Sequence, residues 1–145
     1  MRLVLDSNEY VYAFGAERKA DCEELLRKAA AAAAAGRARV FLPRLVVAEV
    51  GRNMPAVLLK ECHLFWNSIG CVIDEDDAVP SALMAAYLNC GLKPADALIG
   101  AYAEWVGADF LISENRDFLA LTSPLPFTVM KASAFLKTST LPPKT

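Results

Sequence analysis

The chain alternates between short apolar runs and longer stretches with helical character. The short runs are continuous rather than alternating, which is typical of parallel strands buried on both faces. We therefore predict strands at residues 3–5, 40–42, 71–73, 109–112 and 127–130. Helices are predicted between and after them, at residues 10–14, 17–35, 44–53, 55–68, 80–90, 95–106 and 132–136. This alternation predicts a three-layer α/β/α fold with a mainly parallel central sheet of about five strands.

Local signals support several of these boundaries. The stretch 17–35 is rich in Ala, Glu, Lys, Arg and Leu, lacks Pro and Gly, and ends before Gly36, as expected for a helix. Pro80 and Pro94 are expected to start helices, because proline is favoured at the first helical position. The acidic run 74–77 lacks the spacing and central glycine of an EF-hand loop. We expect this run to be a solvated turn.

Length and composition indicate one compact domain. The chain has 145 residues, of which 55% are hydrophobic and 22% charged, which is enough to bury a core and argues against disorder. We expect the domain to cover residues 1–137 and a frayed Ser/Thr/Pro tail to follow at 138–145. The net charge of −2 excludes an overall basic field. Attraction to nucleic acid must then come from a local patch or from metal ions.

Cysteine and histidine usage excludes a spaced structural zinc motif. The four cysteines are scattered without a C-x-x-C pair, and there is one histidine, His63. Reduced cysteines fit an intracellular protein. No signal-peptide pattern is seen, and the longest apolar run, 29–35, is too short to cross a bilayer. We expect a soluble cytoplasmic protein with no membrane partner.

Four acids are candidate site residues: Asp6, Glu49, Asp96 and Asp117. Asp6 and Asp117 follow predicted strands, Glu49 interrupts an otherwise apolar helix, and Asp96 lies in the first turn of a helix. Each has a structural alternative. Asp6 can start a turn, Glu49 can face solvent, and Asp96 can complement a helix dipole. Asp117 can cap a short helix that starts at Phe118. Parallel strands bring their carboxyl ends to one edge, where open α/β sheets bind ligands. We therefore expect Asp6 and Asp117 to converge there, while the helix start that carries Asp96 enters from a neighbouring layer.

The chain resembles the PIN-domain nucleases, most closely the small VapC-type ribonuclease toxins. The resemblance spans nearly the whole chain and rests on Leu5-Asp6-Ser7-Asn8, Val47-Ala48-Glu49-Val50, Ala95-Asp96-Ala97-Leu98-Ile99 and the segment from Leu111 to Phe118. It implies that the four acids gather around one or two Mg²⁺ or Mn²⁺ ions and are catalytic. Relatives often carry an acid where Asn115 stands. Asn115 and Ser7 are therefore secondary candidates, and Asn115 brings an oxygen but no charge.

The implied activity is endoribonucleolytic hydrolysis by a metal-activated water, which leaves a 5′-phosphate and a 3′-hydroxyl. Hard cations bind carboxylates, neutralise phosphate and lower the pKa of a bound water. Four cations near the acids in sequence are candidate contacts to RNA phosphates: Arg116, Arg44, Arg52 and Lys93. The resemblance also implies the toxin of a toxin–antitoxin pair, with a cognate antitoxin protein and a homodimer, in which the stretch 55–68 is a candidate interface.

Other classes fit the motifs less well. A phosphatase of the haloacid-dehalogenase type needs a second acid two residues after its nucleophile, but Asn8 stands there. A receiver domain needs adjacent acids near the first strand, and these are absent. A catalytically weak or inactive scaffold that binds RNA or a partner protein stays open as the alternative.

Overall fold

The computed structural model describes residues 1–138. Its sheet has the strand order β3-β2-β1-β4-β5, and every pairing is parallel. The five strands are β1 (Arg2–Leu5), β2 (Arg39–Pro43), β3 (Ile73–Asp74), β4 (Phe110–Ile112) and β5 (Thr128–Met130). The predicted α/β fold with a parallel five-stranded sheet is confirmed.

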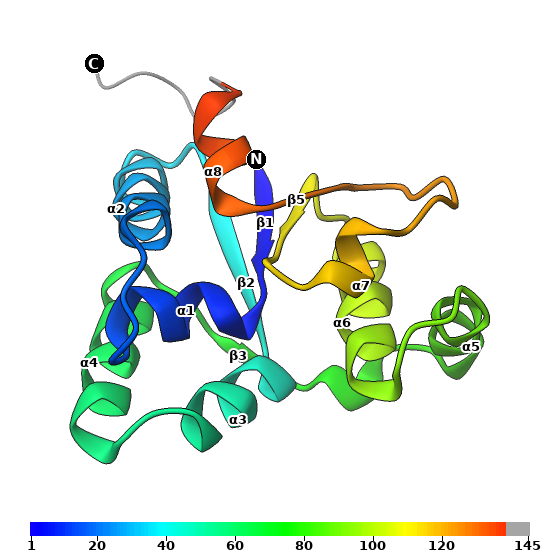
Figure 1. The fold of residues 1–145 in the computed structure, drawn as a ribbon, viewed down its shortest axis with the longest axis horizontal. Helices are drawn as coiled ribbons and strands as arrows, with labels where there is room; N and C mark the ends of the chain where they lie inside the picture. The colour runs from blue at the N-terminus through cyan, green and yellow to red at the C-terminus, as the bar shows by residue number, and fades with distance from the viewer. Residues whose placement is uncertain (139–145) are drawn as a thin grey trace.

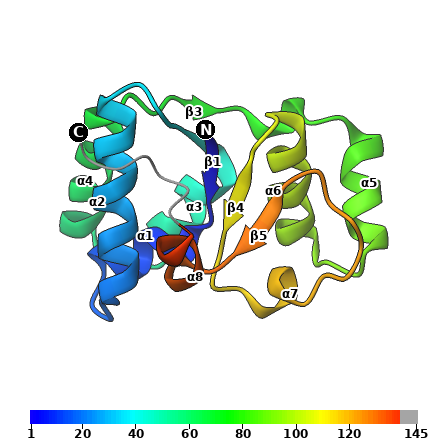
Figure 2. The same ribbon diagram turned by 90° about the horizontal axis from the view of Figure 1, so that it is seen from above.

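Helices cover both faces of the sheet, as Figures 1 and 2 show. In both views α1, α2 and α4 lie on one side, and α5 and α6 lie on the other. The helices are α1 (Ser7–Phe14), α2 (Ala20–Ala34), α3 (Arg44–Arg52), α4 (Ala56–Ser68), the short 3-10 turn η1 (Asp76–Ala78), α5 (Ser81–Asn89), α6 (Pro94–Trp105), α7 (Arg116–Leu119) and α8 (Ala132–Lys137). Among these described helices, none has the length and apolar character that crossing a membrane requires.

The middle of the sheet is the core of the molecule. Leu3, Val4 and Leu5 of β1 have no exposed surface, and Val4 pairs with Phe41 of β2 and Leu111 of β4. A strand with two strand neighbours and helices on both faces has no polar side, which explains its unbroken apolar run. The carboxyl ends of β1 and β4 therefore meet at one edge of the sheet, beside the start of α1.

Two local features hold the helical layers in place. Ala29 and Ala32 of α2 are buried, so the alanine run presents a smooth face to its neighbours. Gly100 lies in α6 where a Cβ would be 2.7 Å from Cδ1 of Tyr87 in α5. Because side-chain atoms do not approach that closely, the contact between α5 and α6 requires glycine.

Some predicted boundaries are wrong by a few residues. The third strand is Ile73–Asp74 rather than 71–73, α1 begins at Ser7 rather than at residue 10, and α2 begins at Ala20 rather than at residue 17. Pro94 is at the start of α6 as predicted, but Pro80 is the cap that precedes α5. Apart from Thr138, the predicted tail at 138–145 lies outside the described residues.

The acidic run 74–77 is only partly a solvated turn, because Glu75 and Asp77 are exposed while Asp74 and Asp76 have partners in other elements. Asp76 is 9% exposed, and its Oδ2 accepts a hydrogen bond of 2.6 Å from the backbone N–H of Leu45 in the first turn of α3. Asp74 accepts a hydrogen bond from the Tyr102 hydroxyl. The run therefore satisfies an N–H group at the start of α3 that has no partner within the helix.

Candidate active site

Asp6 is the buried centre of the candidate site. It follows β1, caps α1 and is 4% exposed. Its Oδ1 accepts from the Ser7 N–H at 2.8 Å, and its Oδ2 accepts from the Ser113 hydroxyl at 2.6 Å. Burial raises the pKa of Asp6, the hydrogen bonds from Ser113 and Ser7 act to lower it, and the charge of Asp96 adds to the rise. The Asp6 carboxyl group is thus held in a fixed orientation at a buried position, where ionisation is energetically costly.

Glu49 reaches the same place from the middle of α3. Its Oε1 is buried, and no hydrogen-bond partner for it is found within residues 1–138. Burial raises the pKa of Glu49, the nearby charges of Asp6 and Asp96 raise it further, and Arg52 acts in the opposite direction. A buried carboxylate oxygen without a donor requires a proton or a cation.

Asp96 enters from the first turn of α6 and is half-buried. Its Oδ1 accepts a hydrogen bond of 3.1 Å from the side-chain amide of Asn115. The Asn115 Oδ1 accepts from the backbone N–H of Asp117 at 2.9 Å and caps α7. The two ends of the Asn115 amide therefore have different roles. The amino group orients Asp96, and the carbonyl oxygen caps α7.

Asp117 lies apart from the other three predicted acids. It is exposed on α7, and within the described chain no hydrogen bond or ion pair involves its carboxylate. The alternative that Asp117 caps a helix from Phe118 is wrong, because α7 begins at Arg116 and its cap is Asn115. The structure thus brings Asp6, Glu49 and Asp96 together electrostatically and leaves Asp117 at the rim.

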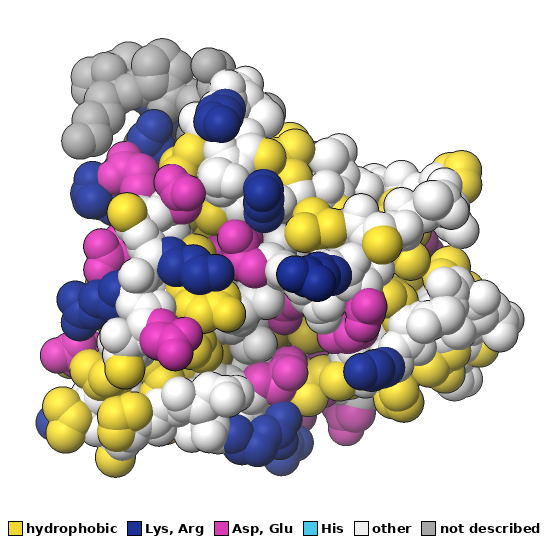
Figure 3. Space-filling view, viewed as in Figure 1, with side chains coloured by type: hydrophobic (Ala, Val, Ile, Leu, Met, Phe, Trp, Pro, Cys, Tyr) yellow, Lys and Arg dark blue, Asp and Glu magenta, His cyan; other side chains and the backbone are white. Residues whose placement is uncertain are grey.

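The candidate phosphate contacts are all exposed side chains around this site. Arg52 is near enough to lower the pKa of Glu49. Arg44 forms an exposed ion pair of 3.3 Å with Glu75, while Lys93 and Arg116 precede or open the helices that carry Asp96 and Asp117. In Figure 3, acidic side chains lie in the middle of the face seen in Figure 1, with Lys and Arg side chains around them.

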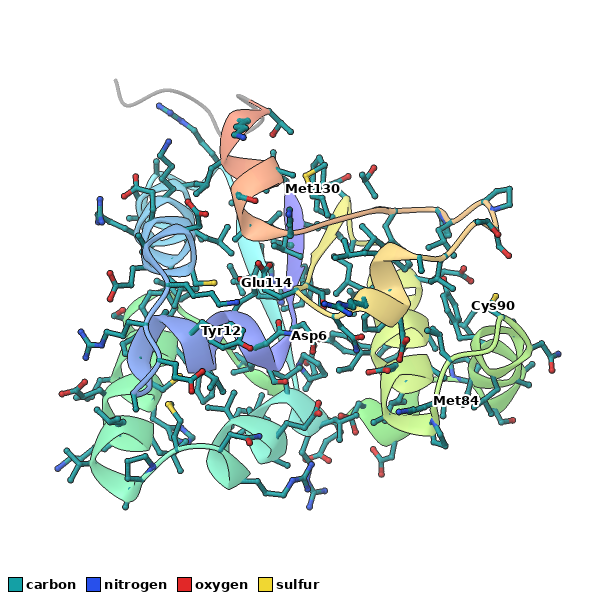
Figure 4. All side chains as sticks on the ribbon, in the orientation of Figure 1. Asp6, Tyr12, Met84, Cys90, Glu114 and Met130 are labelled. Carbon is teal, nitrogen blue, oxygen red and sulfur yellow. The ribbon has the colours of Figure 1, made fainter. Side chains whose placement is uncertain are left out.

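The loop after β4 contains functional residues that the sequence pattern did not reveal. Ser113, fully buried, donates to Asp6 and accepts from the Asn115 N–H at 3.0 Å. The next residue, Glu114, lies against Glu9 of α1, which is also fully buried. Three consecutive residues therefore each contact a different acid. Ser113 and Asn115 donate hydrogen bonds to Asp6 and Asp96, and the carboxyl group of Glu114 lies beside that of Glu9. Figure 4 shows Asp6 and Glu114 in the middle of the molecule.

The three convergent carboxylates suit a hard divalent cation. They offer only oxygen donors, as Mg²⁺ and Mn²⁺ prefer. A cation would be a suitable partner for the buried Glu49 Oε1 atom, which has no donor among residues 1–138. The charge of Asp96 adds to the rise in the pKa of both Asp6 and Glu49, and the charge of Asp6 adds to that of Glu49. A cation among them would remove this repulsion.

Comparisons with known proteins give independent information on the family and the fold. The family model of the PIN domain matches residues 3–123. A search of curated proteins found no match. Among solved structures, one similar chain comes from the crystal structure of VapBC2 from Rickettsia felis bound to a DNA fragment from their promoter. The TM-score is 0.63 with 18% identity, and the alignment covers 89% of this chain and 97% of the other.

Proposed function

The chain belongs to the PIN-domain family, whose members are generally nucleases, and from this premise we propose that it is a Mg²⁺- or Mn²⁺-dependent endoribonuclease. The observation that carries the proposal is that Asp6 and Asp96 lie near enough to raise the pKa of Glu49, whose Oε1 is buried without a donor among residues 1–138. These acids come from the end of β1, from α3 and from α6, and a shared cation would give them a common role.

Asp6 and Asp96 are the principal candidates to hold the ion, and Glu49 holds it directly or through water. When bound, such an ion neutralises phosphate charge and activates water for hydrolysis of the phosphodiester. The Ser113 hydroxyl keeps Asp6 in a fixed orientation, and the Asn115 amide does the same for Asp96. This preorganisation means that little ordering is needed when the substrate arrives.

RNA is the proposed substrate, and Arg52, Lys93 and Arg116 are its proposed phosphate contacts. Their guanidinium and ammonium groups are exposed, Arg52 lies near Glu49, and Lys93 and Arg116 lie at the starts of the helices that carry Asp96 and Asp117. They would supply local positive charge in a chain whose net charge is −2. Arg44 can join them on leaving Glu75, because an exposed ion pair contributes at most about 1 kcal/mol. Asp117, exposed on α7, is the fourth acid of the proposed set.

The partners are part of the same proposal. The likeness to a chain of VapBC2 supports a role as the toxin of a toxin–antitoxin pair with a cognate antitoxin protein. A homodimer through α4 is supported by Val57 and Leu64, which are 73% and 60% exposed and lie seven residues apart on that helix. Sedimentation of a Leu64→Glu variant should show a monomer where the wild type is a dimer. All four cysteines are free thiols, which supports a cytoplasmic location.

Cleavage of mixed RNAs by purified protein tests the proposal. We expect cleavage with Mg²⁺ or Mn²⁺, none in EDTA, and a loss of at least about a hundredfold in Asp6→Asn. Asp77→Asn, which changes an exposed acid of η1, should cleave like the wild type. If wild type and Asp6→Asn are equally inactive yet bind RNA equally well, the chain is the scaffold described above, an alternative that the uncharged Asn115 supports.

A further inference from the structure

A second cluster of potential ligands lies behind the nuclease site, made of Glu9, Cys22 and Glu114. One ligand atom from each of the three lies within 4.8 Å of the others. They come from α1, α2 and the loop after β4. None of the three was among the acids expected to hold Mg²⁺, and Cys22 adds a sulfur atom that the nuclease site lacks.

The Glu9 carboxyl group lacks a positively charged partner among the described residues of this cluster. Glu9 has no exposed surface, and its Oε1 is buried without a hydrogen-bond partner within residues 1–138. Its Oε2 accepts from the Cys22 thiol at 3.1 Å. The neighbouring carboxylate of Glu114 is itself an acceptor. Two carboxylates can face each other in a buried place only with a proton or a cation between them.

The surroundings of the cluster fix its ligands. Glu114 Oε2 accepts from the Ala132 N–H at 3.0 Å, which leaves its other oxygen for Glu9. The Glu114 backbone N–H donates to Asn8 Oδ1 at 3.3 Å. Cys22 is fully buried in the first turn of α2, where the helix dipole favours a thiolate. Burial and the charge of Glu9 raise the pKa of Cys22. Cys22 is therefore a protonated thiol when no metal is bound.

We propose that Glu9, Cys22 and Glu114 form a second cation site that takes a divalent transition ion of the Zn²⁺ class. Two carboxylates and a thiolate form a set that Zn²⁺ and Co²⁺ accept and Mg²⁺ does not. Ligand atoms around tetrahedral zinc lie roughly 3.5 Å apart. Cys22 Sγ and Glu9 Oε2, 3.1 Å apart, already meet this spacing, and Glu114 would have to move by about 1 Å at most. The ion would displace the thiol proton and the proton shared by the carboxyls.

The site would act as a staple rather than as a reaction centre. It ties α1 and α2 to Glu114, whose neighbours Ser113 and Asn115 orient Asp6 and Asp96. An ion here would therefore stiffen the loop that shapes the nuclease site. The proposal does not depend on the nuclease activity, and its test needs no substrate.

Cobalt absorption tests the site, because a Co²⁺–thiolate bond gives a charge-transfer band in the near ultraviolet. The protein is the full chain with Asp6→Asn and Asp96→Asn, which removes two ligands of the nuclease site. We expect one equivalent of Co²⁺ to produce the band and Zn²⁺ to abolish it by competition. Excess Mg²⁺ should leave the band unchanged.

Variants assign the ligands. Cys22→Ser in this background should lose the band, and Glu9→Gln should bind Co²⁺ at least about tenfold more weakly. Cys62→Ser is the matched control, because Cys62 is equally buried but lies outside the cluster; it should keep the band. Circular dichroism of each metal-free variant confirms that it is folded. A folded parent protein without the band, or a band that survives Cys22→Ser, shows that a proton alone lies between the carboxyls and overturns the proposal.

Discussion

Glu9→Gln should stabilise the metal-free protein, and the gain should grow with pH. Glu9 is fully buried beside Glu114, and burial, followed by that neighbour, raises its pKa from 4.5 to about 9. A carboxyl with a raised pKa in the folded state contributes stability that is complete below the unfolded pKa. That stability is lost as pH rises towards the folded pKa, because the unfolded chain ionises first. A glutamine side chain has no such loss.

The magnitude follows from the pKa shift. About pH 7 lies roughly 2.5 units above the ordinary Glu pKa of 4.5, and each unit corresponds to about 1.4 kcal/mol. At neutral pH the free energy of unfolding of the wild type should therefore have fallen by about 3 kcal/mol, a loss that Glu9→Gln does not have. Glutamine also preserves the local contacts, since its amide N–H can donate to Glu114 while its oxygen accepts from Cys22.

Urea unfolding with a chelator present, at several pH values between about 5 and 8, measures the effect. The difference in unfolding free energy between Glu9→Gln and wild type should increase by about 1.4 kcal/mol per pH unit. Glu17→Gln, which changes an exposed acid just before α2, should follow the wild type at every pH. Parallel curves for Glu9→Gln and wild type would refute the reasoning, because Glu9 would then be ionised in the folded protein.

Two further predictions concern the loop after β4 and the packing of α6. Ser113→Ala removes the donor to Asp6, so Mn²⁺ affinity should fall by about 10- to 100-fold, and the acid limb of a cleavage pH profile should move to higher pH. An unchanged profile would exclude Ser113 as a positioning residue. Gly100→Ala places a Cβ 2.7 Å from a Tyr87 ring carbon and should cost about 1–3 kcal/mol in thermal unfolding. Gly51→Ala, whose Cβ meets its nearest atom at 3.7 Å, should be neutral or stabilising by up to about 1 kcal/mol. Equal losses of stability in the two variants would contradict the packing argument.

The sheet was predictable because its strands have no polar face. Runs such as Leu3-Val4-Leu5 carry this signal in a few residues. The edge strand β3 was predicted two residues too early because Val72, although apolar, is 71% exposed. Asp76 was predicted as solvated because its partner, the Leu45 N–H, lies in a distant helix that the local pattern does not reveal.

The candidate site was only partly predictable for the same reason. Acids that end strands or interrupt apolar helices, such as Asp6 and Glu49, are unusual locally. Glu9 is not, because an acid three residues after Asp6 fits an ordinary helix start. Its burial against Glu114 and Cys22 depends on how α1, α2 and β4 pack. The sequence has no spaced zinc motif, and ligands that only the fold brings together, such as Glu9, Cys22 and Glu114, leave no such motif.

Manganese binding tests the central claim most directly. The free Mn²⁺ signal in electron paramagnetic resonance gives the bound fraction for wild type, Asp6→Asn and Glu49→Gln, and RNA cleavage is followed in the same samples. We predict that the wild type binds Mn²⁺ and cleaves, and that both variants lose bound Mn²⁺ and cleavage together. Unchanged Mn²⁺ affinity and full cleavage in Asp6→Asn would contradict the account.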